Sequence, residues 1–119
     1  MNIQQARSDD LDAVRGLLRS CDLPASDLTP AHMEHILVAR GEDTLHGVVG
    51  LEPRGDMALL RSLAVAPGVR GRGLGTRLVE AIEQRAREEG IRTLYLLTTT
   101  AASYFQAHGY DPIERDALP

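Results

Sequence analysis

The chain has 119 residues, a formal net charge of −4 and 43% hydrophobic residues, which are ordinary values for one compact domain over residues 1–119. The mildly acidic balance argues against nucleic acid and against an anionic membrane surface as partners. The N-terminal residues hold no apolar signal core, no stretch approaches about 18 apolar residues, and the single cysteine, Cys21, cannot form an internal disulfide. These features predict a cytoplasmic protein.

The N-terminal third predicts two helices after a short extended segment. Residues 2–7 are expected to be extended, and Ser8 is a good helix cap because its hydroxyl can accept a hydrogen bond from the first turn. Before Pro24, an apolar stripe at helical spacing predicts the first helix; it consists of Leu11, Val14, Leu17 and Leu18. Residues 29–36 begin with a Thr-Pro pair, typical of a cap and a first helical position, and predict a second, short helix.

The middle of the chain predicts antiparallel strands. Residues 37–40 and 45–52 are apolar runs separated by a segment of hairpin composition. A Pro-Arg-Gly-Asp turn at residues 53–56 then leads into a long strand over residues 57–65. We therefore expect the sheet to begin as a meander of neighbouring strands.

The last third predicts alternating helices and strands. Residues 74–89 have an apolar and a charged face, as in an amphipathic helix. Residues 91–98 are β-branched and aromatic with little polar alternation, which predicts a central strand buried on both faces. A short helix ending at Gly109 and an edge strand over residues 110–115 complete a mixed α/β chain with one parallel crossover.

Three glycines within residues 70–75 stand between the long strand and the amphipathic helix. Glycine tolerates positive φ, so such a turn can approach a ligand closely, and the free amides of a helix N-terminus favour phosphate. A P-loop would need Lys where the chain has Leu74, and a dinucleotide fingerprint would need Gly or Ala where it has Thr76. With arginines at positions 70 and 72 beside it, the segment predicts a diphosphate cradle.

The pattern Arg70-x-x-Gly73-x-Gly75 resembles the coenzyme A pyrophosphate loop of the GCN5-related N-acetyltransferases, the GNAT superfamily. Residues 62–67 are similar to the strand that precedes this loop, and residues 104–110 resemble the family's late helix followed by Gly-aromatic. The resemblance implies an α/β fold with a mixed, mostly antiparallel sheet flanked by helices, and acetyl-CoA as co-substrate. The residues it implies for coenzyme A binding are Leu63, Val65, Arg70, Gly71, Arg72, Gly73, Leu74, Gly75, Thr76 and Phe105.

By the same resemblance, the chain is expected to be an N-acetyltransferase. It would move the acetyl group of acetyl-CoA to the amine of a small, amino-acid-like acceptor by direct attack in a ternary complex. A protein-directed acetyltransferase and a coenzyme A-binding module without catalysis are the alternatives. The four histidines and one cysteine show no zinc-ligand spacing, so no metal is expected.

The family pattern implies two catalytic residues and one substrate residue. Glu52 stands where a strand ends beside the thioester, and it is either the general base or a solvated glutamate. Arg61 replaces an acid that many relatives carry, and it either holds an acceptor carboxylate in its fork or forms an internal ion pair. Family members often have an acid tyrosine where this chain has Phe105, so the adjacent Tyr104 is either that acid or a structural residue.

Within the superfamily, residues 51–53, 59–63 and 95–101 resemble the small acetyltransferases associated with arsenic-resistance gene clusters. That resemblance implies a small amino compound as acceptor. The sequence stops at Pro119, after what corresponds to the first strand of a closing hairpin, so the sheet is expected to lack its final strand. A second subunit could cover the open edge, which predicts a homodimer.

Overall fold

The structure is a computed structural model that describes residues 2–42, 44–96, 102–107 and 109–110. Its elements, with η marking a 3-10 helix, are β1 (Asn2–Gln5), η1 (Ser8–Asp10), α1 (Leu11–Ser20), η2 (Pro30–His35), β2 (Ile36–Arg40), β3 (Leu45–Arg54), β4 (Met57–Val65), η3 (Pro67–Val69), α2 (Leu74–Glu88), β5 (Thr93–Tyr95) and α3 (Ala102–Ala107). None of the helices in these ranges is long and apolar enough to cross a membrane.

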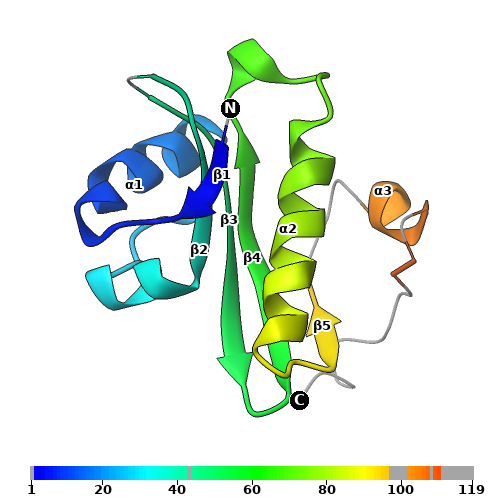
Figure 1. Ribbon diagram of the computed structural model, residues 1–119. Coiled ribbons are helices and arrows are strands. Elements are labelled where there is room, and N and C mark those ends of the chain that lie inside the picture. The colour runs from blue at the N-terminus through cyan, green and yellow to red at the C-terminus, as the bar shows by residue number, and fades with distance from the viewer. Residues whose placement is uncertain (1, 43, 97–101, 108, 111–119) are drawn as a thin grey trace.

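The described strands form one five-stranded sheet in the order β1-β2-β3-β4-β5. Neighbouring strands from β1 to β4 are antiparallel, whereas β5 runs parallel to β4 and follows it through α2. Figure 1 shows α1 on one side of the sheet and α2 on the other. The predicted α/β fold, with a mixed, mostly antiparallel sheet flanked by helices, is confirmed.

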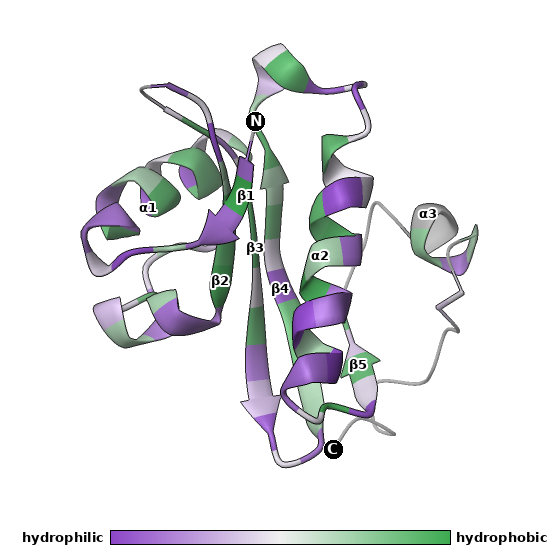
Figure 2. Cartoon of the chain, viewed as in Figure 1, coloured by the Kyte–Doolittle hydropathy of each residue, from purple (hydrophilic) through white to green (hydrophobic). Residues whose placement is uncertain are grey.

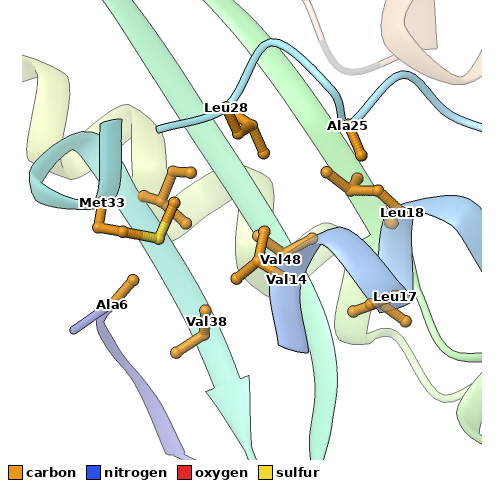
Figure 3. Close-up of a cluster of buried hydrophobic side chains, with 11 residues drawn as sticks. Ala6, Val14, Leu17, Leu18, Ala25, Leu28, Met33, Val38 and Val48 are labelled. Atoms are coloured by element: carbon orange, nitrogen blue, oxygen red, sulfur yellow. The ribbon is translucent and has the colours of Figure 1, made fainter. Parts of the chain in front are cut away.

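The alternation of side chains along the central strands divides the core into two layers. In the α1 layer, Val38 and Val48 of the sheet pack against Val14, Leu17 and Leu18 of the helix (Figure 3). The neighbouring strand residues point to the other face, because successive residues of a strand alternate. Together with apolar residues of α2, they form the α2 layer, which includes Leu37, Ala39, Val49, Leu51, Leu74, Leu78, Ile82 and Ala86. Figure 2 shows the hydrophobic and hydrophilic bands that alternate along α2 as this packing requires.

β3 is longer than predicted and ends at Arg54 rather than at Glu52. Its last residues pair with the start of β4, so the hairpin turn shrinks to residues 55–56. β2 pairs with β3 only as far as Gly50, and the missing N–H of Pro53 therefore costs no hydrogen bond to β2. Glu52 consequently lies inside a strand, and the prediction that it stands at a strand end is wrong.

Two other predicted elements need correction. Of the strand predicted over residues 91–98, the structure shows β5 at Thr93–Tyr95, and these residues are exposed or half-buried rather than buried on both faces; residues 97–98 lie outside the described part of the chain. The second helix is a 3-10 helix that ends at His35, because Ile36 is already extended and pairs with Gly50. The strand predicted over residues 110–115 falls almost wholly outside the described residues, and the described Tyr110 belongs to no strand.

Asp10 ties the start of α1 to β2, and only 7% of its surface is exposed. Its Oδ2 atom accepts hydrogen bonds from the Arg7 amide at 2.7 Å and from Arg40 Nη2 at 2.6 Å. The Arg40 hydrogen bond lowers the pKa of Asp10, burial opposes this, and the Arg7 amide adds to the lowering. The predicted cap, Ser8, lies inside η1, and Asp10 closes the first turn in its place.

We expect Asp10→Asn, which keeps the shape but removes the charge, to lower the free energy of unfolding by about 1–3 kcal/mol at pH 7. The pKa of Asp10 is lower in the folded than in the unfolded chain. Its contribution is therefore complete above the unfolded pKa of about 4 and is lost as pH falls through the folded value. Urea unfolding should show the gap between the two proteins narrowing below about pH 4. Asp9→Asn changes an exposed neighbour and is the control; an equal loss there would contradict the ion-pair role.

Candidate functional site

The glycine loop between β4 and α2 has the backbone conformation that the sequence predicts. Gly71 and Gly73 have φ values of +82° and +77°, which residues with side chains rarely adopt. A Cβ atom added to either glycine would meet no heavy atom within 4 Å. Glycine is therefore required by the backbone conformation rather than by crowding, and the space beside the loop is open to a ligand.

α2 begins directly after this loop, with Gly73 at its N-cap position. Gly73 has no side chain to cap the helix, and the 15-residue helix directs the positive end of its dipole at the loop. Leu74 is buried in the α2 layer and fixes the start of the helix, while Arg72 is exposed beside it. Backbone amides and a positive helix end suit an anion, so a diphosphate fits this set of donors.

The Arg70 side chain turns back onto the end of β4. Its Nε atom donates to the Val65 carbonyl at 3.0 Å, and its Nη2 atom donates to the Cys21 sulfur at 3.3 Å. Cys21 directly follows α1, so Arg70 ties the glycine loop to the helix on the other side of the sheet. This arginine thus supplies positive charge near the loop, while some of its donors already bind the protein itself.

β4 carries a bulge at Ser62 and Leu63. The register with β3 shifts at this point, so that both residues lie opposite the single residue Val49. Ser62 has a φ of +60°, which is uncommon for a residue with a side chain and marks the distortion. A bulge leaves backbone groups out of the ladder of hydrogen bonds, where a ligand can use them. The strand is therefore opened just before Val65, which leads into the loop.

The bulge also changes the layer that the side chains of β4 face. Before the bulge, Ala58 and Leu60 pack in the α2 layer, yet Ala64, with the same parity, packs in the α1 layer. Leu63 and Val65, which are predicted to contact coenzyme A, consequently pack against the α2 layer. Arg61 has the opposite parity to Leu60 and faces the α1 side. One strand thus presents different groups to the two layers.

Arg61 lies at the centre of an ion-pair cluster with Glu52 and Asp27. Its Nη1 and Nη2 atoms form a fork on Asp27, at 2.7 Å to Oδ2 and 3.0 Å to Oδ1. The same Nη1 atom donates to Glu52 Oε1, and Nε donates to Ser62 Oγ at 3.1 Å. Of the two interpretations of Arg61, the structure thus displays the internal ion pair, with Glu52 and Asp27 as its partners.

The charges of the cluster support one another. The hydrogen bond from Arg61 lowers the pKa of Asp27 against the opposing effect of burial. The hydrogen bond to Asp27 raises the pKa of Arg61, burial opposes it, and the hydrogen bond to Glu52 raises it further. One guanidinium between two carboxylates leaves the cluster with a net negative formal charge. Arg61 can therefore bind a further anion only if one of the carboxylates gives way.

Phe105 anchors α3 rather than lying exposed. It is buried, and its ring packs edge-on against Tyr110 with the ring centroids 5.3 Å apart. The Tyr110 hydroxyl donates to Glu83 of α2 at 2.7 Å, which fixes this end of the chain against the helix that follows the glycine loop. Tyr104 lies in α3, but its side chain falls outside the described part of the chain, so its catalytic role stays a prediction.

Two residues of the site were missed by sequence reasoning. Asp27 lies in the irregular segment between α1 and η2, where an aspartate is ordinary and signals no partner. The sequence also does not reveal the positive φ of Ser62, because glycine or asparagine would be the usual marker of that conformation. A strand arginine with little exposure predicts some acidic partner, and only the fold identifies which one. Within the described ranges, no group of three His, Cys, Asp or Glu residues is placed to hold a metal.

Comparison with known proteins matches residues 5–110 to the model of the acetyltransferase (GNAT) family. An amino-acid acetyltransferase of Pseudomonas aeruginosa is 36% identical over 89 residues, which is 73% of this chain and 21% of that protein. Another, from Pseudomonas syringae pv. syringae, is 48% identical over 60 residues, which is 50% of this chain and 14% of that protein. The chain therefore spans about a fifth or less of the length of these curated relatives.

Among solved structures, the N-acetylglutamate synthase from Neisseria gonorrhoeae, complexed with coenzyme A and N-acetyl-glutamate, is similar with a TM-score of 0.90. Its sequence identity to this chain is 26%. The match covers 99% of this chain and 30% of that one, so the similarity extends through the described fold.

We expect Gly73→Ala to lower the free energy of unfolding by about 1–2 kcal/mol, because a residue with a Cβ is strained at positive φ. Gly68→Ala is the matched control, since it adds the same methyl group in the same connection, also into open space, at a glycine without positive φ. That substitution should be neutral or slightly stabilising. Urea unfolding of both variants measures the difference, and equal effects would contradict the conformational requirement at Gly73.

Proposed function

Because the chain belongs to the acetyltransferase (GNAT) family, we propose that it transfers the acetyl group of acetyl-CoA to the amine of a small, amino-acid-like acceptor by direct attack in a ternary complex. One observation carries the proposal: glycines at positive φ lead into the N-terminus of α2 directly after a bulged strand. The acceptor class is supported by the amino-acid acetyltransferases of Pseudomonas and by the gonococcal N-acetylglutamate synthase, which is complexed with coenzyme A.

Coenzyme A binding is assigned to the glycine loop and to the strand before it. Backbone groups of Leu63 and Val65 beside the bulge would bind the arm that carries the thioester, Phe105 would border that arm from α3, and Arg70 and Arg72 would add positive charge. The amides that would hold the diphosphate are those of Gly71, Gly73, Leu74, Gly75 and Thr76. The bound molecule supplies an activated acetyl group.

Glu52 is our candidate for the general base. Within the described part of the chain, Arg61 engages its Oε1 atom, which leaves Oε2 to take the proton of the amine, directly or through a water. The ion pair also fixes the orientation of the carboxylate, which matters because a base must lie within hydrogen-bond reach of the proton. Tyr104 would protonate the leaving thiolate, although water can also do so because a thiol has an ordinary pKa of about 8.5.

Arg61 is our candidate for holding the acceptor's carboxylate. A guanidinium fork matches the two oxygens of a carboxylate and gives paired, charge-assisted hydrogen bonds. The relatives reported above are amino-acid acetyltransferases, and they support only the broad class of amino-acid-like acceptors. That the acceptor is a small amino compound, as for the acetyltransferases of arsenic-resistance gene clusters, is a narrower proposal that rests on the sequence resemblance alone. We also propose a cytoplasmic location and a homodimer, and light scattering of the purified protein would test the homodimer.

A coenzyme A-binding module without catalysis is the second candidate, and one observation favours it: Phe105 stands where family members often have the acid tyrosine. The deciding experiment incubates the protein and acetyl-CoA with amino acids, polyamines, aminoglycosides and peptides, and measures release of free thiol. Release with amino acids supports the proposal, and release with peptides alone supports a protein-directed enzyme. Binding of acetyl-CoA without release in any mixture supports the non-catalytic module.

Acetyl-CoA at about 100 times its dissociation constant should stabilise the fold by about 2.7 kcal/mol. Gly73→Asp should abolish this gain, because it places a carboxylate where the diphosphate binds. Gly55→Asp is the matched control: it puts the same side chain at a φ of +65° in the β3–β4 turn, at the opposite end of β4. Both variants should melt earlier than the wild type, but only Gly73→Asp should lose the rise in Tm on adding acetyl-CoA. A rise that persists in Gly73→Asp would contradict the cradle.

Glu52→Gln should lower kcat by about 10²-fold or more at neutral pH while the Tm rise with acetyl-CoA remains, because an amide cannot accept the proton. Tyr104→Phe should cost much less if water protonates the thiolate. Steady-state kinetics with the best acceptor of the amine panel measure both. Large and equal losses would instead identify Tyr104 as the acid, and an unchanged kcat in Glu52→Gln would remove Glu52 as the base.

A further inference from the structure

Asp27 makes with Arg61 the contact that a free carboxylate would make. Both of its oxygens receive hydrogen bonds from the two terminal nitrogens of the guanidinium, at 2.7 Å and 3.0 Å. This paired geometry is how arginine recognises a carboxylate in a ligand. The position on the Arg61 fork where an acceptor's carboxylate would bind is therefore already filled by a side chain of the protein.

The three members of the cluster differ in how firmly they are held. Arg61 and Glu52 lie on adjacent strands, and their side chains are 16% and 27% exposed. Asp27 is 54% exposed and lies in an irregular segment, so its side chain is the member that can leave. The backbone around it is fixed, because Ala25 and Leu28 are buried in the α1 layer and the Leu28 amide donates to the Ala25 carbonyl. Asp27 can therefore leave Arg61 by rotating its side chain, without opening the core.

Exchange of one carboxylate for another preserves the electrostatic balance of the cluster. A carboxylate that replaces Asp27 restores the same charge and the same two hydrogen bonds to Arg61. An amine without a carboxylate cannot do this, and displacing Asp27 would then leave a poorly exposed guanidinium with one partner fewer, which is costly. The exchange is thus selective for acceptors that carry their own carboxylate.

We propose that Asp27 occupies the acceptor's carboxylate position on Arg61 in the free protein, and that the acceptor binds by displacing it. The proposal rests on the function proposed above and narrows its substrate class to α-amino acids. Asp27 Oδ2 and Glu52 Oε1 both bind Arg61 Nη1, so they lie at most about 6 Å apart, twice the length of a hydrogen bond. A carboxylate in this position brings the group on its adjacent carbon close to Glu52, as an α-amine requires.

The kinetic test is Asp27→Asn, with Asp22→Asn as the matched control. Asp22 lies in the same segment, is exposed, and has a φ of +57°, which asparagine tolerates well. The control therefore removes the same charge nearby without touching Arg61. If Asp27 occupies Arg61 about nine-tenths of the time, its removal should strengthen apparent binding of a carboxylate about 10-fold. KM for the best amino acid of the amine panel should fall by about that factor in Asp27→Asn, and KM for the α-amide of the same amino acid should stay unchanged.

A positioning role for Asp27 gives a different result. If Asp27 only orients Arg61 and Glu52, then Asp27→Asn should lower kcat alike for the amino acid and for its amide, and that outcome would overturn the proposal. A fall in KM of equal size in Asp22→Asn would also overturn it, because the effect would then come from the general charge of the segment. Asp27→Ala should repeat the result of Asp27→Asn, since neither residue can compete as a carboxylate.

A binding test separates this proposal from the proposed function, because it needs no turnover. Protein with ¹⁵N-labelled arginine is titrated with sodium acetate against sodium chloride of equal ionic strength, and the Arg61 Nε–Hε signal, identified by its loss in Arg61→Lys, is followed by NMR. The signal should shift at about 10-fold lower acetate concentration in Asp27→Asn than in the wild type or in Asp22→Asn. Equal midpoints in all three proteins would refute the displacement. Absence of thiol release with every amine, together with the expected acetate shift, would refute only the acetyltransferase function.

Discussion

The bulge at Ser62 and Leu63 is the constraint on which the candidate site depends. A regular strand would send Arg61, Leu63 and Val65 to the same face of the sheet, because they share a parity. The extra residue breaks that rule, so Arg61 meets Asp27 on the α1 side while Leu63 and Val65 pack against the α2 layer. A single strand thus contributes to the ion-pair cluster on one face and to the α2 layer on the other.

The strain of the bulge is compensated by contacts that belong to the site itself. A positive φ at a residue such as Ser62 costs on the order of 1 kcal/mol or more and persists only where the surroundings enforce it. Here Arg61 Nε donates to Ser62 Oγ, and Ala64 is buried just beyond the bulge. The ion-pair cluster and the distorted strand therefore stabilise each other. A change to Arg61 acts on the backbone of β4 as well as on the charges around it.

Much of the fold follows from patterns that short segments carry by themselves. The strand at 57–65, the helix from Leu74 and the amphipathic stripe of α1 were predicted because side-chain periodicity is a local property. The ends of β3 and β5 were not predicted, since they depend on which residues of a neighbouring strand are available for pairing. Pro53 could stay in β3 only because β2 had already ended, a fact that no local pattern contains.

Some features of the candidate site could likewise be predicted from local sequence, and others could not. The glycine loop was predictable, because a backbone at positive φ restricts the residue type at that position. Glu52 and Arg61 were predictable as individual residues through the family resemblance, but their mutual contact and the fork on Asp27 were not. The ion pair joins residues 34 positions apart, so predicting it requires knowledge of how the chain runs from α1 to β4. From the sequence alone, any of several acidic residues could have been the partner of Arg61.

The separation of the two layers has a consequence for how such a domain can change its acceptor. Asp27 and its flanking residues belong to the α1 side, whereas the glycine loop and the strand residues predicted to contact coenzyme A belong with α2. Substitutions in the segment between α1 and η2 can therefore change the partner of Arg61 without changing the loop at the start of α2. Arg70 is the exception, because its contacts with Cys21 and Val65 join the end of α1 to the connection that carries the glycines. Arg61 also links the two sides, because its hydrogen bond to Ser62 supports the bulge beside Leu63 and Val65. A substitution at either arginine is therefore expected to act on both sides of the sheet.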